Sequence, residues 1–299
     1  MTSLPYTSAD ALAVALVQRM RNAFGTGDLP RRRAEVSYRR LVARLATTSP
    51  GLWVIKGGFG LILRLDPSRT SNDIDIAYFD EGAEPDDALA ALRRACAAEL
   101  DDYFNFTVDR IAEVADDRAR RVTVICRLGA REWSRFHVDL VLARAAIESE
   151  PLGDAPSLTG IAAIDEIPLG VELLAWPQQI AEKVCAIFEI RDGGPSGRSR
   201  DLTDLAMIAA QISNLDGTTL CDTLALEAEG RPLIAALPTS LQLEPEQRRE
   251  WAQASRRATR GAPIPFEEAE RIARQLVDPV LDGTARGRKW DATTGSWTA

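Results

Sequence analysis

The chain has 299 residues, of which 45% are hydrophobic and 27% are charged, and its formal net charge is −8. This composition is typical of a globular protein long enough for one or two domains. No signal peptide and no apolar run of about 18 residues is present, so we expect a cytoplasmic protein that does not cross a membrane. The acidic balance argues weakly against a general nucleic-acid binder.

Four cysteines and one histidine narrow the chemistry further. The cysteines lie far apart and form no Cys-x-x-Cys, so we expect reduced core residues rather than disulfides or a zinc site. The single histidine, His137, excludes a multi-histidine zinc site. It shares a strand face with Asp139, so it either lines a pocket or is an ordinary half-buried residue.

Two helices are expected in the first 50 residues. Apolar residues at helical spacing predict one over 10–24 and a second over 30–45, with Pro30 near its start. The second helix carries several arginines against one acid, Glu35. They are Arg31, Arg32, Arg33, Arg39, Arg40 and Arg44. Such a helix presents either a basic face for RNA phosphates or a solvated face, and the sequence leaves both interpretations open.

A strand over 73–79 carries two carboxylates. Asp73 and Asp75 alternate with Ile74 and Ile76. Side chains two apart on a strand point to the same face, so both acids project together while the isoleucines enter the core. Two like charges this close repel unless a cation lies between them. The pair therefore predicts a metal site.

A glycine turn precedes this strand, between a strand over 52–55 and a short helix over 59–65. Gly57 and Gly58 let the backbone approach a phosphate and offer its amides to it. Lys56, one of three lysines in the chain, adjoins the turn. Arg64 and Arg69 are expected to contact phosphate or to pair with acids. The turn and the aspartates together predict metal-dependent chemistry on a nucleoside triphosphate.

A third carboxylate is expected beside the pair. The chain continues with a helix over 86–100 and strands over 104–110, 119–127 and 133–143, with two short strands within 159–174. Asp139 lies inside the apolar run of the strand over 133–143, where a charge is costly unless it is paired or bound to a metal. Three carboxylates on neighbouring strands can hold two Mg²⁺ ions, the arrangement used for phosphoryl transfer.

The second half of the chain is expected to be helical. The predicted helices cover 177–191, 200–213, 217–230, 243–258 and 265–281. The polar tail over 284–299 is expected to be loose.

The motifs now on the page resemble those of a known family. The family pattern is matched by Lys56-Gly57-Gly58, Arg64, Ser71-Asn72-Asp73-Ile74-Asp75, the strand around Asp139, Pro177-Gln178-Gln179-Ile180-Ala181-Glu182-Lys183 and Arg198-Ser199-Arg200-Asp201-Leu202-Thr203-Asp204-Leu205. This order resembles the polymerase-beta-like nucleotidyltransferases, and more closely the AbiEii-type toxins, which include the MenT toxins. The resemblance implies a mixed α/β (α+β) sheet domain over 1–174 and a helical domain over 175–299 that completes the nucleotide cleft.

The resemblance also implies roles for individual residues. Ser71, Asp73, Asp75, Lys183 and Asp204 would be catalytic. Lys56, Gly57, Gly58, Ser71 and Lys183 would bind the nucleotide, and Asp73, Asp75 and Asp139 would hold two Mg²⁺ ions. The alternative for Lys183 is an ordinary surface lysine with no role in phosphate binding. Asp201 would cap or support the helix over 200–213.

The activity implied is transfer of a nucleoside monophosphate from an NTP to an acceptor hydroxyl, as the toxin of a toxin–antitoxin system. The acceptor implied is the 3′ end of a tRNA, and a cognate antitoxin encoded nearby would neutralise the enzyme. Two alternatives stay open. The same carboxylates would serve an enzyme that modifies a protein hydroxyl or a small molecule, which would not need the arginine helix. A non-catalytic nucleotide-binding module is the other, although the intact acids argue against it.

Overall fold

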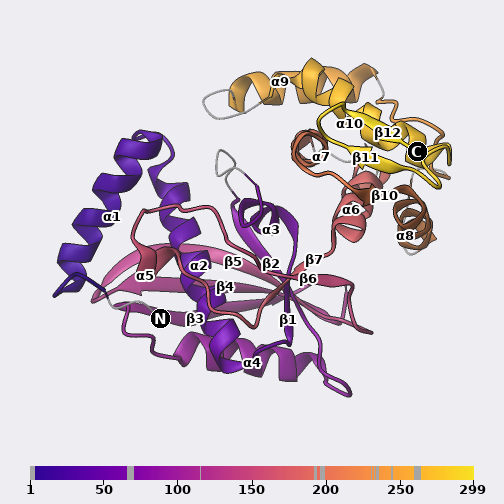
Figure 1. Ribbon diagram of the computed structural model, residues 1–299. Helices are drawn as coiled ribbons and strands as arrows, with labels where there is room; N and C mark the ends of the chain where they lie inside the picture. The colour runs from indigo at the N-terminus through magenta and orange to yellow at the C-terminus, as the bar shows by residue number, and fades with distance from the viewer. Residues whose placement is uncertain are drawn as a thin grey trace. The chain divides into compact units, whose positions relative to one another are not determined.

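The computed structural model comprises two compact units, Met1–Leu174 and Ala175–Ala299, whose elements are labelled in Figure 1. It describes residues 4–65, 71–114, 116–191, 194–195, 199–229, 231, 233, 236–243, 245–258 and 264–299. Arg69 and Arg198, which the sequence motifs include, lie outside the described residues. Within these ranges no helix combines the length and apolar character needed to span a membrane.

The first unit is built on a seven-stranded mixed sheet in the order β3-β4-β5-β2-β1-β7-β6. The strands are β1 (Trp53–Ile55), β2 (Asp73–Tyr78), β3 (Phe104–Glu113), β4 (Ala119–Leu128), β5 (Arg131–Leu142), β6 (Ser149–Pro151) and β7 (Glu172–Leu174). Strand β2 runs antiparallel to β1 and parallel to β5. The mixed α/β fold expected from the sequence is confirmed.

Helices α2 and α4 pack against one face of this sheet (Figure 1). The helices of the unit are α1 (Ala9–Phe24), α2 (Leu29–Thr48), α3 (Gly57–Ile62), α4 (Pro85–Ala97) and α5 (Ala162–Asp165). The core between helices and sheet includes Leu41, Leu92, Ile74 and Val138, all fully buried. Because strand residues alternate between faces, the polar partners of Ile74 and Val138 point away from this core. Of the two short strands expected within 159–174, one forms as β7, and α5 precedes it.

Helix α2 buries most of its arginines. Arg32, Arg39, Arg40 and Arg44 are at most 2% exposed. Both sequence interpretations, an RNA-binding face and a solvated face, are therefore wrong for these four residues. The reason lies in packing, since α2 contacts α1, α4, α5 and the sheet at once. A helix enclosed on several sides must bury charged positions that would otherwise face water.

Arg40 and Arg44 are stabilised by sharing one buried acid, Asp102. Arg40 Nε lies 2.7 Å from Oδ2 of Asp102, and Arg44 Nη2 lies 2.8 Å from Oδ1. Other N–H groups of the two guanidiniums donate to backbone carbonyls, including those of Ala98 and Ala163. Burial alone would raise the pKa of Asp102, but the two guanidiniums outweigh it and hold this pKa below its usual range. The network ties α2 to α4, α5 and the start of β3.

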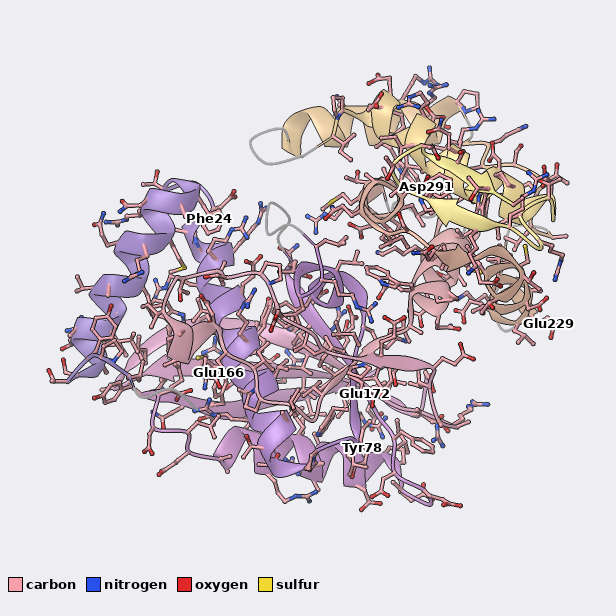
Figure 2. The ribbon with its side chains drawn as sticks, in the orientation of Figure 1. Phe24, Tyr78, Glu166, Glu172, Glu229 and Asp291 are labelled. Atoms are coloured by element: carbon pink, nitrogen blue, oxygen red, sulfur yellow. The ribbon has the colours of Figure 1, made fainter. Side chains whose placement is uncertain are left out.

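Arg32 and Glu35 form a second buried pair on α2, 2.9 Å apart. The Arg32 guanidinium also lies over the ring of Phe24, 4.0 Å from its centre, and Figure 2 labels Phe24 at the end of α1. Burial raises the pKa of Glu35 to about 7, although Arg32 and, more weakly, the Ser71 backbone amide lower it. Glu35 is thus a buried carboxyl that accepts a hydrogen bond from the Arg32 guanidinium.

The second unit is mainly helical. Its helices are α6 (Trp176–Phe188), α7 (Ser199–Gln211), α8 (Gly217–Glu229), α9 (Pro245–Ala258) and α10 (Phe266–Leu281). Its short strands are β8 (Ile190–Arg191), β9 (Gly194–Pro195), β10 (Leu215–Asp216), β11 (Lys289–Asp291) and β12 (Ser296–Thr298). Helix α6 packs on α8 and α7, and α10 packs on α7.

The C-terminal tail is ordered, so the expectation of a loose segment was wrong. Strands β11 and β12 pair as an antiparallel hairpin that places Trp290 opposite Trp297. Both rings are buried, and their indole nitrogens donate to the carbonyls of Ala209 and Leu276 at 2.9 and 3.0 Å. Two buried tryptophans explain the order, since large aromatic side chains contribute much of the packing energy of a small sheet.

Candidate active site

Asp73 and Asp75 lie side by side on β2, on the opposite face from the core. The alternating residues Ile74 and Ile76 are fully buried, whereas both aspartates are only partly buried. The Ser71 hydroxyl donates a hydrogen bond to Oδ1 of Asp73 at 3.3 Å. The two carboxylates are thus positioned by strand geometry and have no part in the core.

Gly57 packs directly against the Asp75 carboxylate. It begins α3 with a φ of +59°, in the left-handed region that favours glycine. A Cβ at this position would overlap the carboxylate of Asp75. The Lys56 amide also donates to the Asp75 carbonyl at 2.9 Å. The glycine turn and the second aspartate therefore form one local unit, with Gly57 and Gly58 in the first turn of α3.

Asp139 on β5 lies next to Asp75 in the parallel register of β2 and β5. Its carboxylate, however, is held by Arg121 of β4. Arg121 Nε lies 2.7 Å from Oδ1 and Nη2 lies 2.6 Å from Oδ2, so the contact is bidentate. The sequence predicts Asp139 as a third metal ligand, and the structure gives it an arginine partner.

Asp73, Asp75 and Asp139 form a row of carboxylates on β2 and β5, and all three interact electrostatically with Arg121. Hydrogen bonding to Asp139 raises the pKa of Arg121 above its usual value, with smaller contributions from the charges of Asp73 and Asp75. Arg121 is thus a positive group that interacts with all three carboxylates. Sequence reasoning missed it as a site residue. The available signal was the alternation of Arg121 and Thr123 with buried valines along β4.

Lys183 and Asp204 lie together in the second unit, on α6 and α7. Lys183 Nζ is 2.9 Å from Oδ1 of Asp201 and 2.5 Å from Oδ2 of Asp204. All three residues are at most 8% exposed. Lys183 is therefore not a surface lysine. Two carboxylates hold one ammonium, as a buried charge requires.

The structure thus groups the expected residues into two sets. Lys56, Gly57, Gly58, Ser71, Asp73, Asp75 and Asp139 belong to the first unit, and Lys183, Asp201 and Asp204 belong to the second. Arg64 donates to the Leu174 carbonyl at 2.7 Å and pairs with Glu150 at 3.3 Å. His137 is exposed opposite Asp73, with Nδ1 3.3 Å from the Thr123 hydroxyl.

The family profile described as nucleotidyl transferase AbiEii toxin, type IV toxin–antitoxin system, matches residues 40–274. The chain belongs to this family. It is therefore a nucleotidyltransferase, and its family implies an NTP substrate and an antitoxin partner. The match includes the aspartates of β2 and the lysine–aspartate group of α6 and α7. Among curated proteins, no relative matches the chain.

One solved structure shares this fold. The chain is similar to MenT4, a nucleotidyltransferase toxin from Mycobacterium tuberculosis H37Rv, with 19% identity and a TM-score of 0.58 over 92% of this chain and 99% of that one. It also matches JHP933 from Helicobacter pylori at 17% identity and a TM-score of 0.43, over 85% of this chain and 94% of that one. At this identity the first likeness supports the AbiEii fold and not a substrate.

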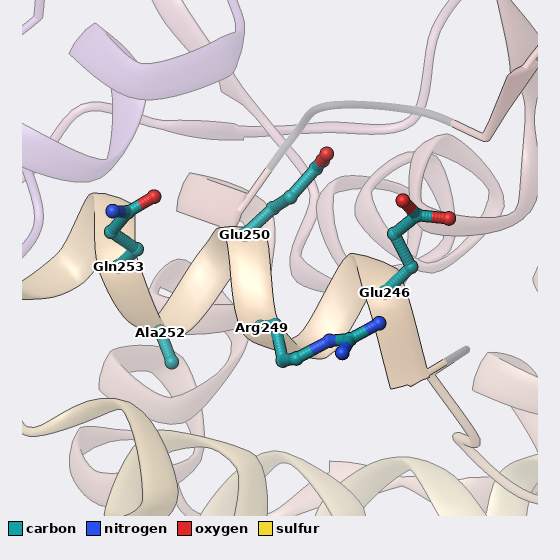
Figure 3. A pocket seen from close by; sticks show the side chains of 5 residues that line it. All are labelled: Glu246, Arg249, Glu250, Ala252 and Gln253. Atoms are coloured by element: carbon teal, nitrogen blue, oxygen red, sulfur yellow. The ribbon is translucent and has the colours of Figure 1, made fainter.

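A separate surface hollow lies on α9 of this AbiEii protein. It has a volume of about 460 Å³ and is lined by Glu246, Arg249, Glu250, Ala252 and Gln253 (Figure 3). All five side chains come from a single helix. Its charged groups, two glutamates and one arginine, do not converge on one point where a ligand could bind. This hollow lacks the chemistry found around Asp73 and Asp75.

Proposed function

We propose that this protein transfers a nucleoside monophosphate from an NTP to an acceptor hydroxyl with the help of Mg²⁺, and that the acceptor is the 3′ end of a tRNA. The single observation that carries the chemistry is the placement of Asp73 and Asp75 beside Gly57. The tRNA acceptor and the toxin activity rest on family membership and resemblance. In this proposal the product blocks aminoacylation, and the cognate antitoxin encoded nearby relieves it.

Asp73 and Asp75 would hold the metal. Carboxylate oxygens are the ligands that Mg²⁺ prefers, and two on one strand face suffice because the ion keeps several waters. The fit is supported by the close packing of Gly57 on Asp75, which fixes that carboxylate. When bound, Mg²⁺ would activate the acceptor hydroxyl and offset charge on the pyrophosphate leaving group.

The remaining residues would bind and orient the substrate. The Ser71 hydroxyl orients Asp73 through its hydrogen bond. Amides at Gly57 and Gly58, with Lys56 beside them, would hold phosphate oxygens. Lys183 would offset phosphate charge, and Asp204, which bonds to it, would position its ammonium. Asp139 is expected to be a ligand from sequence, but its pairing with Arg121 opposes this role.

The acceptor decides between the proposal and its alternatives. An enzyme that modifies a protein hydroxyl or a small molecule would use the same aspartates. The arginines of α2 no longer favour RNA, because most of them are buried. A non-catalytic module does not agree with membership of a nucleotidyltransferase family, and the aspartate pair and the buried lysine–aspartate group are intact.

One labelling experiment tests the proposal. The protein is incubated with each α-³²P-labelled NTP, Mg²⁺ and either total RNA or total protein, and the products are separated on gels. We expect label in RNA of tRNA size, lost with the Asp73→Ala variant and with EDTA. Label in protein alone would overturn the RNA acceptor but not nucleotide transfer, whereas no label in any fraction would overturn the transferase activity.

A growth assay tests the toxin activity separately. Expression of the wild-type chain without its antitoxin is expected to arrest growth, and Asp73→Ala or Asp204→Ala is expected to relieve the arrest. Normal growth with folded and catalytically active wild-type protein would remove the toxin role while leaving the transferase activity in place.

A further inference from the structure

Three residues on neighbouring strands form one row across the face of the sheet opposite the core. Asp75 of β2 is paired in register with Asp139 of β5, and Asp139 is paired in register with Arg121 of β4. The arginine uses Nε and Nη2 to contact both oxygens of Asp139. The row therefore runs from Asp75, an acid of the proposed metal site, through a second acid, Asp139, to the Arg121 guanidinium.

The contact between Arg121 and Asp139 is built into the strand register. The two residues lie directly opposite each other on antiparallel strands, where side chains of the same face meet. Exposed ion pairs are usually weak, but a bidentate arginine–carboxylate contact between preplaced residues is the favourable exception. The contact also relieves repulsion between Asp139 and its like-charged neighbour Asp75.

Charge balance limits what the row can bind. The Arg121 guanidinium neutralises the Asp139 carboxylate, so the carboxylates of the row that Arg121 does not hold are those of Asp73 and Asp75. A guanidinium on Asp139 also repels an ion approaching that carboxylate. Among the residues that the structure describes, no three His, Cys, Asp or Glu side chains are grouped as a metal-binding cluster.

We propose that Arg121 is a positioning residue that keeps Asp139 out of the metal site, so that the nucleotide-free protein binds one divalent cation through Asp73 and Asp75. Asp139 then acts as the counter-ion that holds the Arg121 guanidinium beside the site, as a fixed positive charge for the phosphates of the substrate. This inference rests on the proposed function for the metal site itself, and departs from the two-ion, three-carboxylate arrangement expected from sequence.

Mn²⁺ binding in the absence of nucleotide tests this arrangement. The number and affinity of bound ions are measured by electron paramagnetic resonance titration for the wild type and for Asp75→Asn, Arg121→Gln, Arg121→Lys and Arg121→Gln/Asp139→Asn. Asp139→Asn alone does not discriminate, because it leaves an unneutralised guanidinium and weakens binding under either arrangement. The double variant does, since it removes the acid and the guanidinium together.

We expect one Mn²⁺ per wild-type chain and an affinity that the double variant retains within about threefold, because a neutral pair replaces a neutral pair. Arg121→Gln should bind Mn²⁺ roughly tenfold more tightly, since an opposing charge is lost. Arg121→Lys keeps the charge and should stay near wild type. Thermal unfolding and circular dichroism check that each variant is folded. If Arg121→Gln does not fold, Arg121→Lys and the double variant still test the inference.

Two results would overturn the inference. Binding of two ions by the wild type is one, and a loss of about tenfold or more in the double variant is the other, since Asp139 would then be a ligand. Asp75→Asn separates this failure from that of the proposed function. It should abolish Mn²⁺ binding, and unchanged binding in Asp75→Asn, or none in wild type, removes the proposed metal site and the inference with it.

Discussion

Gly57 and Asp75 are packed so closely that no side chain other than hydrogen fits at position 57. The Cα of Gly57 faces the Asp75 carboxylate, and its φ of +59° is one that residues with a Cβ rarely adopt. The first residue of α3 thus fixes the position of a carboxylate on β2. Residues 18 apart in sequence form a single local unit through this contact.

Replacing Gly57 by alanine is expected to displace Asp75 and to reduce nucleotide transfer at least tenfold. Gly82→Ala is the matched control, since Gly82 has a φ of +78° and nothing within 4 Å of a built Cβ. Both variants should lose about 1–2 kcal/mol of stability from the left-handed backbone. The transfer assay and urea unfolding measure the two effects, and equal activity in both variants would contradict the role of this contact.

Asp73→Ala should abolish transfer while leaving the fold intact. The side chain is partly exposed and accepts a hydrogen bond from the Ser71 hydroxyl, so its loss removes no core contact. We expect the midpoint of thermal unfolding to change by no more than a few degrees, the scale of about 1 kcal/mol. Asp80→Ala, at an exposed acid beyond β2, is the control and should keep activity. A folded Asp73→Ala protein that still transfers nucleotide would reject the metal site.

Lys183→Met is expected to destabilise the second unit as well as to slow transfer. Lys183→Met removes a positive charge that contacts two buried acids, Asp201 and Asp204, and the loss of one partner from a buried ion pair typically costs about 3–5 kcal/mol. Lys289→Met at an exposed lysine should be neutral. Hydrogen exchange of α6 and α7 measures the loss locally. Stability equal to wild type would show that the contacts of Lys183 with Asp201 and Asp204 do not stabilise the protein in solution.

Glu35 should make stability depend on pH. Its pKa is raised by burial from 4.5 to about 7 in the folded protein. A raised carboxyl pKa stabilises the fold below pH 4.5 through the bound proton, and this contribution is lost as pH rises through about 7. The unfolding free energy of Glu35→Gln relative to wild type should therefore increase by up to about 3 kcal/mol between these values.

Urea unfolding of wild type and Glu35→Gln at several pH values measures this difference. Glu99→Gln, at an exposed glutamate, is the control and should follow wild type. Parallel pH curves for wild type and Glu35→Gln would mean that Glu35 is ionised in the folded protein across the whole range, held by Arg32.

The aspartate pair could be read from sequence because its pattern is local. Alternation of Asp73 and Asp75 with two isoleucines defines both the strand and the face on which the acids lie. The arginines of α2 show the opposite case. Their spacing indicates a helix, but whether a charged helical position meets water or Asp102 depends on elements far along the chain. Composition suggested a basic surface where packing made a buried network.

The partner of Asp139 depended on a single irregularity in the β4–β5 hairpin. Leu128 pairs with Arg131 at the turn, and an unbroken register from there would place Arg120 opposite Asp139. A shift between Cys126 and Arg127 moves the register by one residue and places Arg121 there instead. One residue of shift exchanges the two faces of a strand, so the bulge decides which arginine meets the acid.

Local sequence patterns were enough to predict the acids of β2, the glycine turn beside them and the change from mixed strands and helices to a mainly helical second half. Each of these follows from side-chain periodicity and backbone preference over a few neighbouring residues. Three features depend on the folded arrangement: α2 buries most of its arginines, Lys183 lies between two aspartates, and Asp139 faces Arg121. These outcomes depend on strand register and helix packing, which bring together charges that are distant in the chain and whose pairing local patterns do not encode.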